Sequence, residues 1–274
     1  MKKLIQNTLG YFDVSITRKS GLEKLRADYA DCADYADCAD CADCADCVRS
    51  LDLLKSIHPE VRGRCVDLLE VSKSQLSQDL FVLSELGFKE NGYFVEFGAT
   101  NGIHLSNSYL LEKEFLWNGI LAEPARMWHS ALKENRSAAI ETKCVWKKSG
   151  ETLVFNETEI GELSTIDDFS DSDNHFARRE YGKKYNVETI SLMDLLEYFD
   201  APQSIDYLSI DTEGSEYEIL KGFDFERYKF SVITCEHNYT PMREKIYNLL
   251  TCNGYERKFE HLSKWDDWYV NTLK

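Results

Sequence analysis

Short apolar runs and amphipathic stretches alternate along the chain from Gly92 onward. The runs "GYFVEFG", "GILAEP", "IDYLSID" and "FSVITCEH" lack polar alternation, which is typical of strands covered on both faces of a sheet. The stretches between them carry apolar residues at helical spacing. This alternation predicts an α/β fold with an open, mostly parallel sheet. The last runs, "GYERKF" and "DWYVN", predict a C-terminal antiparallel hairpin.

Local signals place several element boundaries. Residues 74–88 predict a helix with leucines along one side, and the run at 138–146, "AAIETKCVW", predicts a third strand. Ser191 stands where a helix N-cap is expected, just before "LMDLLEYF". Ser215 and Glu218 have the spacing of a capping box at the start of a further helix.

A triplet repeat precedes this region. We expect residues 1–73 to be an N-terminal helical segment that contains this low-complexity repeat at 27–47, and residues 74–274 to be the main domain. The repeat carries seven aspartates and five of the nine cysteines. No Gly or Pro turns the chain around a metal cluster, and each thiol follows an aspartate, whose charge disfavours the thiolate. We interpret the repeat as a spacer; metal capture and a self-association helix are the alternatives.

Charge and cysteine content narrow the class of protein. The formal net charge is -16, which argues against a nucleic-acid or anionic-membrane surface. No apolar run approaches the roughly 20 residues that cross a bilayer, and the first residues do not form a signal peptide. An odd number of cysteines indicates reduced thiols. We therefore expect a cytoplasmic protein without nucleic-acid or membrane partners.

The turn after the first strand, "E-F-G-A-T-N-G", begins at Glu96. A dinucleotide fingerprint that began at Gly98 would need glycines at positions 100 and 103. Thr100 and Ile103 stand there instead, so the pattern disfavours NAD and FAD. The looser spacing of Gly98 and Gly102 suits a cofactor without a pyrophosphate, with Glu96 available to its amino group. A tight turn of purely structural importance is the alternative.

Glu123 follows the second strand, 25 positions beyond Gly98. An acid at this position can accept hydrogen bonds from both hydroxyls of a ribose, as in other nucleoside-binding sheets. Alternatively, its charge complements the dipole of the helix that begins at Pro124.

Charged residues also follow two later strands. Asp211 and Glu213 come after "IDYLSI", and Glu236 and His237 come after "FSVITC". These strands should be neighbours, so we expect the charged side chains to meet in one crevice, where pKa values are commonly perturbed. Loop or capping roles for the acids, and an ordinary buried role for His237, are the alternatives.

Together these residues resemble the FkbM family of S-adenosylmethionine-dependent methyltransferases. The resemblance rests on "GYFVEFGATNGIHLSNSYLLEKEFLWNGILAEP", "IDYLSIDTEGSEYEILKGFDF" and "VITCEHNY", and it extends over about residues 74–274. It implies a seven-stranded, Rossmann-like methyltransferase sheet with S-adenosyl-L-methionine over the first two strand ends. Ser108 and Asn101 depart from the family pattern. The positions that the resemblance assigns to the cofactor are Glu96, Gly98, Ala99 and Gly102 near the sulfonium, Ser106 and Asn107 at the next helix, Glu123 at the ribose, and Cys144 and Val145 at the adenine.

The predicted reaction is methyl transfer to an oxygen. His237 or Asp211 would remove the hydroxyl proton, while Glu213 and Glu236 would position the acceptor. A divalent metal ion between Asp211 and Glu236 is an alternative way to lower the hydroxyl pKa.

The polar segment at 156–186 is the expected acceptor lid. Three of its residues, His175, Arg178 and Arg179, are candidate substrate contacts. The family resemblance points to a small-molecule or carbohydrate acceptor, such as a sugar, a glycan or a secondary metabolite. Two other classes stay open: a methyltransferase fold that serves as a catalytically inactive interaction module, and a nicotinamide dehydrogenase, which the glycine pattern disfavours.

Overall fold

The computed structural model describes residues 42–273. Residues 27–41 of the repeat therefore lie outside the described residues, and its last six residues, 42–47, begin helix α3 (Ala42–Ser56). Within residues 42–273, no helix combines the length and apolar character needed to span a bilayer.

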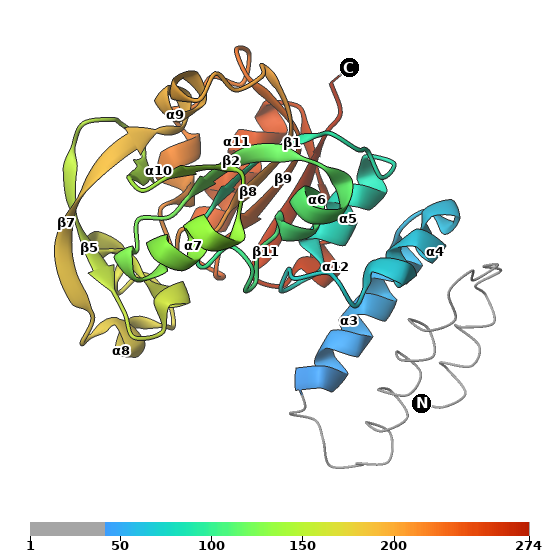
Figure 1. Cartoon of the computed structure of the whole chain (residues 1–274), viewed down its shortest axis with the longest axis horizontal. Coiled ribbons are helices and arrows are strands. Elements are labelled where there is room, and N and C mark those ends of the chain that lie inside the picture. Colours follow the sequence, from blue (N-terminus) through green and yellow to red (C-terminus); the bar gives the residue numbers. More distant parts are fainter. Residues whose placement is uncertain (1–41, 274) are drawn as a thin grey trace.

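A seven-stranded mixed sheet forms the centre of the molecule (Figure 1), with strand order β10-β11-β9-β8-β1-β2-β3. Strands β9, β8, β1, β2 and β3 are parallel, and β11 is antiparallel to both β9 and β10. The mostly parallel sheet with a C-terminal antiparallel pair is confirmed. The strands are β1 (Tyr93–Phe97), β2 (Asn118–Ala122), β3 (Ala139–Glu141), β8 (Ser204–Ile210), β9 (Lys229–Glu236), β10 (Tyr255–Lys258) and β11 (Asp266–Asn271).

Helices cover both faces of this sheet because its strands are apolar on both sides. In β1, Phe94 packs into one hydrophobic cluster, whereas Val95 and Phe97 pack into the other. The first face is covered by α5 (Gln78–Glu85), α6 (Tyr109–Phe115), α7 (His129–Asn135) and α12 (Glu260–Ser263). The second face is covered by α9 (Leu192–Tyr198), α10 (Glu216–Leu220) and α11 (Met242–Cys252).

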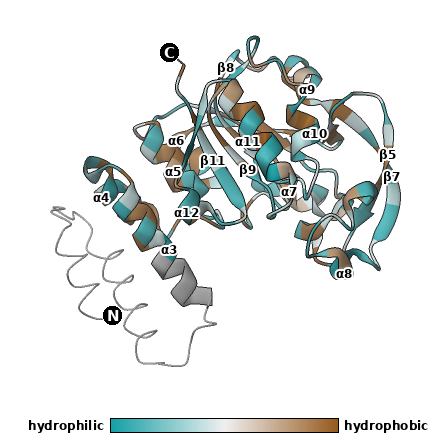
Figure 2. Cartoon of the chain, turned by 180° about the vertical axis from the view of Figure 1, so that it is seen from behind, coloured by the Kyte–Doolittle hydropathy of each residue, from teal (hydrophilic) through white to brown (hydrophobic). Residues whose placement is uncertain are grey.

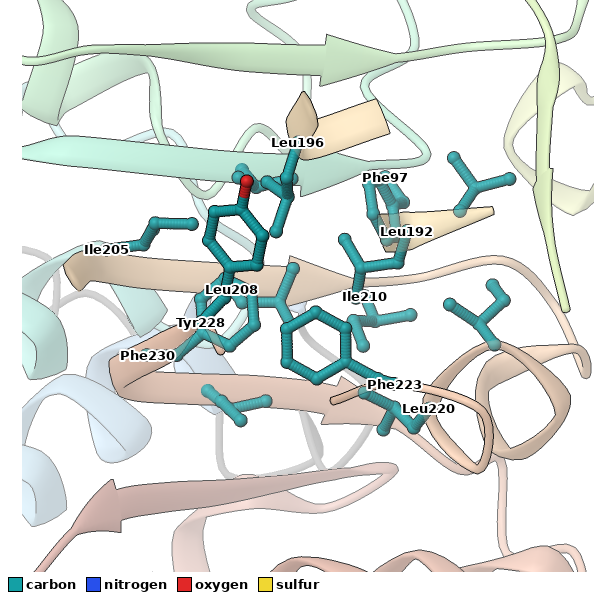
Figure 3. Packing of buried hydrophobic residues seen from close by; sticks show 14 of the residues in the cluster. Phe97, Leu192, Leu196, Ile205, Leu208, Ile210, Leu220, Phe223, Tyr228 and Phe230 are labelled. Carbon is teal, nitrogen blue, oxygen red and sulfur yellow. The ribbon is translucent and has the colours of Figure 1, made fainter. Parts of the chain in front are cut away.

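The second face has a densely packed core. Figure 3 shows Leu208 and Ile210 of β8 beside Phe223 and Phe230, with Leu192 of α9 close by. Figure 2 shows brown and teal residues alternating along α11, in keeping with one buried and one exposed face. The carboxyl ends of the strands are thus held by a rigid scaffold on both sides.

A smaller sheet lies at one side of the main sheet (Figure 1), with strand order β4-β7-β5-β6. Its strands are β4 (Cys144–Trp146), β5 (Thr152–Glu157), β6 (Thr165–Ile166) and β7 (Lys183–Ser191). The prediction of one strand at 138–146 was therefore wrong, because the run divides between β3 and β4. The Glu141 carboxylate accepts hydrogen bonds from the amides of Thr142 and Lys143, which turns the chain there.

The polar segment at 156–186 contains part of this small sheet. It includes the end of β5, a 3₁₀ turn at Gly161–Leu163, β6, a second 3₁₀ turn at Asp167–Phe169, the short helix α8 (Phe176–Arg179) and the start of β7. The segment is thus ordered around a core of its own that includes Trp146, Phe155 and Ile166.

The N-terminal helices share the core of the main domain. Leu54 of α3, Ile57 just after it and Cys65 of α4 (Pro59–Leu68) are buried in the same cluster as Phe81 of α5 and Trp268 of β11. The hydrophobic core therefore crosses the boundary that we predicted at residue 73.

One predicted helix cap is confirmed and one was wrong. Ser191 caps α9, with its hydroxyl accepting from the amide of Asp194. Ser215 precedes α10 but makes no such bond to the helix; its hydroxyl donates to Thr212. The Glu216 carboxylate, not Glu218, accepts hydrogen bonds from the amides of Thr212 and Gly214.

Candidate active site

Two adjoining cavities open at the carboxyl ends of β1, β2 and β8. The first cavity is enclosed by these strand ends, by β4 and by the segment that leads into β6. The second cavity lies over the ends of β8 and β9 and is bordered by the region before α8. Leu105, Glu162 and Asp211 line both cavities. A ligand in one would thus be a neighbour of a ligand in the other.

Six of the residues predicted to bind the cofactor line the first cavity: Glu96, Gly98, Asn107, Glu123, Cys144 and Val145. The other three do not line it. Ala99 is fully buried in the core, Gly102 packs against Arg136, and the Ser106 hydroxyl donates to Glu96. These three support the walls of the cavity.

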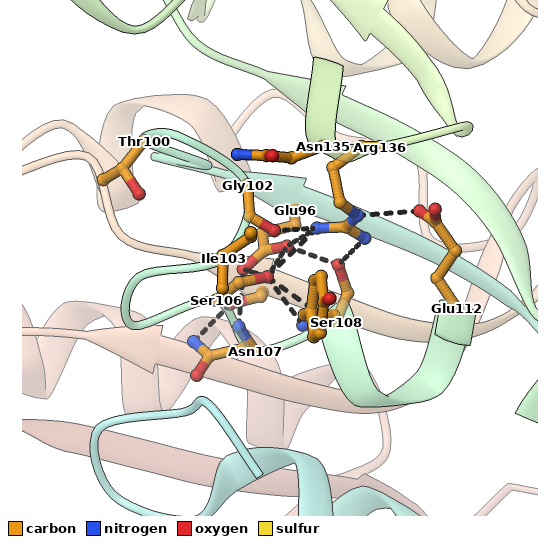
Figure 4. A network of polar contacts seen from close by, with 12 residues as sticks. Glu96, Thr100, Gly102, Ile103, Ser106, Asn107, Ser108, Glu112, Asn135 and Arg136 are labelled. Atoms are coloured by element: carbon orange, nitrogen blue, oxygen red, sulfur yellow. Dashed lines mark hydrogen bonds and ion pairs between the residues drawn. The ribbon is translucent and has the colours of Figure 1, made fainter. Parts of the chain in front are cut away.

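The Glu96 carboxylate organises the turn between β1 and α6 (Figure 4). It accepts hydrogen bonds from the hydroxyls of Ser106 and Ser108 and from the amide of Asn107. The Asn107 side chain in turn donates to the Ser209 hydroxyl on β8. Glu96 therefore borders the cavity, and several of its lone pairs hold the loop in place.

Arg136, at the end of α7, completes this network and was missed by the sequence analysis. Its guanidinium is buried, binds Glu112 at 2.7 Å, and lies 3.7 Å from Glu96. It also donates to the Gly102 carbonyl and the Ser108 hydroxyl. Gly102 has φ +81°, and a Cβ there would lie 2.5 Å from the Arg136 side chain, so glycine is required for this contact.

Gly98 is needed where β1 meets β8. Its φ is +76°, and a Cβ at this position would lie 2.0 Å from the Asp211 carbonyl oxygen. The absence of a side chain lets the ends of the two strands approach each other. Gly98 thereby brings Asp211 to the first cavity.

Glu123 is buried at the end of β2. Its carboxylate accepts hydrogen bonds from the amides of Thr100 and Ala125, each at 2.8 Å. Burial raises its pKa to about 7, even though both hydrogen bonds favour the charged form. A carboxylate has about four lone-pair directions, so two remain for a ligand.

The first cavity is narrow in this conformation, with a volume of about 60 Å³. That is room for about five water molecules. Gly161, Glu162, Ser164 and Ile166 close it from the side of the small sheet. Glu162 is joined to the loop after β1 by His104, whose Nε2 lies 3.3 Å from Oε1 of Glu162.

Three carboxyl groups meet in the second cavity: Asp211 and Glu213 after β8 and Glu236 at the end of β9. We call them the acidic cluster. The pairing of Ile210 with Cys235 sets the two strand ends side by side, as predicted. Burial raises the pKa of Asp211 to about 6 and raises the pKa values of Glu213 and Glu236 well above their usual range. Mutual repulsion adds to the effect of burial for Glu213 and Glu236.

Arg179 connects the small sheet to the acidic cluster. Its guanidinium is fully buried, binds both oxygens of Asp173 at 2.9 and 3.0 Å, and donates to Glu213 at 2.8 Å. The Asn238 amide donates to the same Glu213 oxygen. Arg179 does not line either cavity, so it positions Glu213, whereas His175 and Arg178 do line the second cavity.

The backbone around the acidic cluster is held in unfavourable conformations. Glu213, Asn238 and Tyr239 have φ values of 59°, 44° and 56°. Non-glycine residues adopt this left-handed region at a cost that surrounding contacts must offset, and such residues gather at functional sites.

His237 lines neither cavity. Its ring is buried, with Nδ1 accepting from the Tyr239 amide at 3.0 Å and Nε2 lying 3.8 Å from Asp267. Burial lowers its pKa to about 4. The structure therefore does not bring His237 together with the acidic cluster.

The family model of the methyltransferase FkbM domain matches residues 96–265, which is more than half of the chain. A comparison with curated proteins finds no match.

Three similar solved structures are all methyltransferases. A putative RNA methyltransferase from Pyrococcus horikoshii is 13% identical, with 72% of this chain and 83% of that chain covered and a TM-score of 0.35. A precorrin-6y C5,15-methyltransferase from Geobacter metallireducens is 12% identical, with 70% and 85% covered and a TM-score of 0.35. The METTL16 methyltransferase domain is 11% identical, with 85% and 81% covered and a TM-score of 0.37.

At these identities and scores, the assignment rests on the family match. That match spans Glu96, the loop after β1, Glu123 and the acidic cluster, which are the residues around the two cavities. The chain belongs to the FkbM methyltransferase domain family.

Proposed function

We propose that the protein transfers a methyl group from S-adenosyl-L-methionine to a hydroxyl oxygen of a sugar, a glycan or another small metabolite. The observation that carries this proposal is the position of Asp211, which lines both cavities. A donor in the first cavity and an acceptor in the second would meet beside its carboxylate. The net charge of -16 makes a nucleic-acid acceptor unfavourable.

The residues of the first cavity suit this cofactor chemically. Glu123 has lone pairs left for two ribose hydroxyls, and the buried Cys144 and Val145 offer an apolar surface to an adenine ring. Glu96 and Asp211 place negative charge where the sulfonium and the amino group would lie. The cavity is narrow in this conformation, so we expect the segment at 161–166 to move outward when the cofactor binds.

The cofactor, when bound, supplies an activated methyl group. The chain then has to align the acceptor oxygen with that group, which reduces the entropy lost on reaching the transition state. It also has to accept the hydroxyl proton as the O–CH₃ bond forms. Asp211 can do so, because its pKa of about 6 leaves the carboxylate largely charged at neutral pH.

The second cavity suits a polar acceptor with one apolar face. Tyr239 and Trp265 provide aromatic surface, while Arg178, His175 and Asn238 provide hydrogen-bonding groups. Pyranose rings present both kinds of surface, which supports the carbohydrate part of the proposal.

Calorimetric titration with S-adenosylhomocysteine tests the cofactor site. We expect the wild type to bind and Glu123→Ala to lose most of the affinity, with Glu218→Ala, a partly exposed residue of α10 that lines neither cavity, as the matched control. Binding that is equal in all three proteins would remove Glu123 from the site, and no binding by a folded wild type would refute the proposal. A screen of nucleotide sugars and glycans for methyl transfer, with Asp211→Asn as the negative control, then tests turnover.

A further inference from the structure

The acidic cluster has more carboxyl groups than the removal of one proton from an acceptor hydroxyl requires. One carboxylate oxygen from each of Asp211, Glu213 and Glu236 lies within 4.8 Å of the others. Arg179 brings one positive charge to Glu213, but it also binds Asp173. The group therefore keeps a negative excess beside the second cavity.

The hydrogen bonds of the cluster are incomplete. Glu213 receives donors from Arg179 and Asn238. The Glu236 carboxyl interacts with that of Asp211, but its Oε2 atom is buried and receives no hydrogen bond from a donor group within residues 42–273, and the residue is only 7% exposed. A buried acceptor without a donor costs about 1–3 kcal/mol, and more when it is charged. Such an atom in the wall of a cavity is suited to binding a ligand with positive charge.

We propose that Asp211, Glu213 and Glu236 bind a hard divalent cation, Mg²⁺ or Mn²⁺, at the edge of the second cavity. Carboxylate oxygens are the ligands that these ions prefer. The oxygens converge from two adjacent strand ends that the packed sheet holds in place. No thiol or imidazole belongs to the cluster, which disfavours softer metals such as zinc.

The consequence for catalysis rests on the proposed function. Mg²⁺ is six-coordinate, so three protein oxygens leave positions for two adjacent oxygens of the acceptor. This favours an acceptor with vicinal hydroxyls. The ion would lower the pKa of a bound acceptor hydroxyl. The hydroxyl proton would pass to the second oxygen of Asp211 as the O–CH₃ bond forms, and the S–CH₃ bond would break to leave neutral S-adenosylhomocysteine.

Mn²⁺ binding to the full-length protein, followed by electron paramagnetic resonance, tests the site directly. We expect the wild type to bind one more equivalent than Glu236→Gln or Asp211→Asn, and Mg²⁺ to displace it. Glu→Gln and Asp→Asn remove charge without removing volume, and thermal unfolding verifies that each variant folds. Glu218→Gln, a partly exposed residue that forms ion pairs with Lys147 and Lys221, is the matched control.

The aspartates of the repeat at 27–47 also offer carboxylates, and comparison among the variants cancels their contribution because all of them retain it. Titrations of wild type and Glu236→Gln that superimpose would overturn the proposal. Titration of the same samples with S-adenosylhomocysteine separates the two hypotheses. Mn²⁺ binding without cofactor binding would support the cation site and refute the methyltransferase activity, and the reverse result would refute only the cation site.

Discussion

Replacing Arg179 by methionine should destabilise the protein strongly. Methionine keeps the apolar stem of the side chain but removes the guanidinium that binds Asp173 and Glu213. The Arg179 side chain is 0% exposed, and those of its partners are 1% and 7% exposed, so water cannot replace the lost charge. The change leaves two buried carboxylates without their cation.

Breaking a buried ion pair by removing one partner costs about 3–5 kcal/mol. For a domain of this size, that corresponds to a decrease in Tm of about 6–20 °C. Burial raises the pKa of Glu213 and the charge of Arg179 opposes that rise, so the pKa should rise further in the variant. A carboxyl whose pKa is raised in the folded state loses stability as pH rises, and the variant should lose more than the wild type. The difference in stability between the variant and the wild type should therefore be smallest near pH 5 and largest above neutrality.

Thermal unfolding at several pH values, followed by circular dichroism, measures this deficit. Arg178→Met is the matched control, because Arg178 is the adjacent residue of α8 and is exposed; its stability should change by less than about 0.5 kcal/mol. Equal Tm values for the two variants would show that Arg179 does not stabilise the junction between the small sheet and β8. A deficit that grows toward acid pH would refute the electrostatic explanation.

Three further outcomes follow from the site. Affinity for S-adenosylhomocysteine should rise between about pH 6 and 8 as Glu123 loses its proton, and calorimetry should find this rise absent in Glu123→Gln. His237→Gln should leave the pH profile of kcat unchanged, and Asp211→Asn should abolish turnover. A changed pH profile in His237→Gln together with normal turnover in Asp211→Asn would indicate that His237, and not Asp211, is the base. His104→Ala should speed cofactor association in stopped-flow measurements by freeing Glu162, and an unchanged rate would show that the contact between the two side chains does not keep the first cavity narrow.

Much of the fold and the site could be predicted because the signals are local. Apolar runs followed by Glu123, Asp211 or Glu236 define the strand ends, and parallel strands bring their carboxyl ends to one edge. The direction of His237 is a different case. Its ring contacts the Tyr239 amide and lies near Asp267, and no local signal in the sequence specifies that direction.

Other features depend on contacts far apart in the chain. Arg136 stands at the end of a helix with no local sign that it will be buried, and it reaches Glu96 beside Gly102, 34 positions earlier in the chain. The division between β3 and β4 arises because Glu141 binds the amides that follow it, and apolar periodicity does not register such a bond. Arg179 and Glu213 are likewise joined only by tertiary packing.

The strand order has a consequence for biosynthesis. β11 lies between β9 and β10, and it supplies Trp268 and Tyr269, one to each hydrophobic cluster. A nascent chain on the ribosome therefore cannot complete the sheet until Asn271 has emerged. Until then β9 presents an open, apolar edge that can pair with other chains. The nascent chain should thus depend most on chaperones while this edge is exposed.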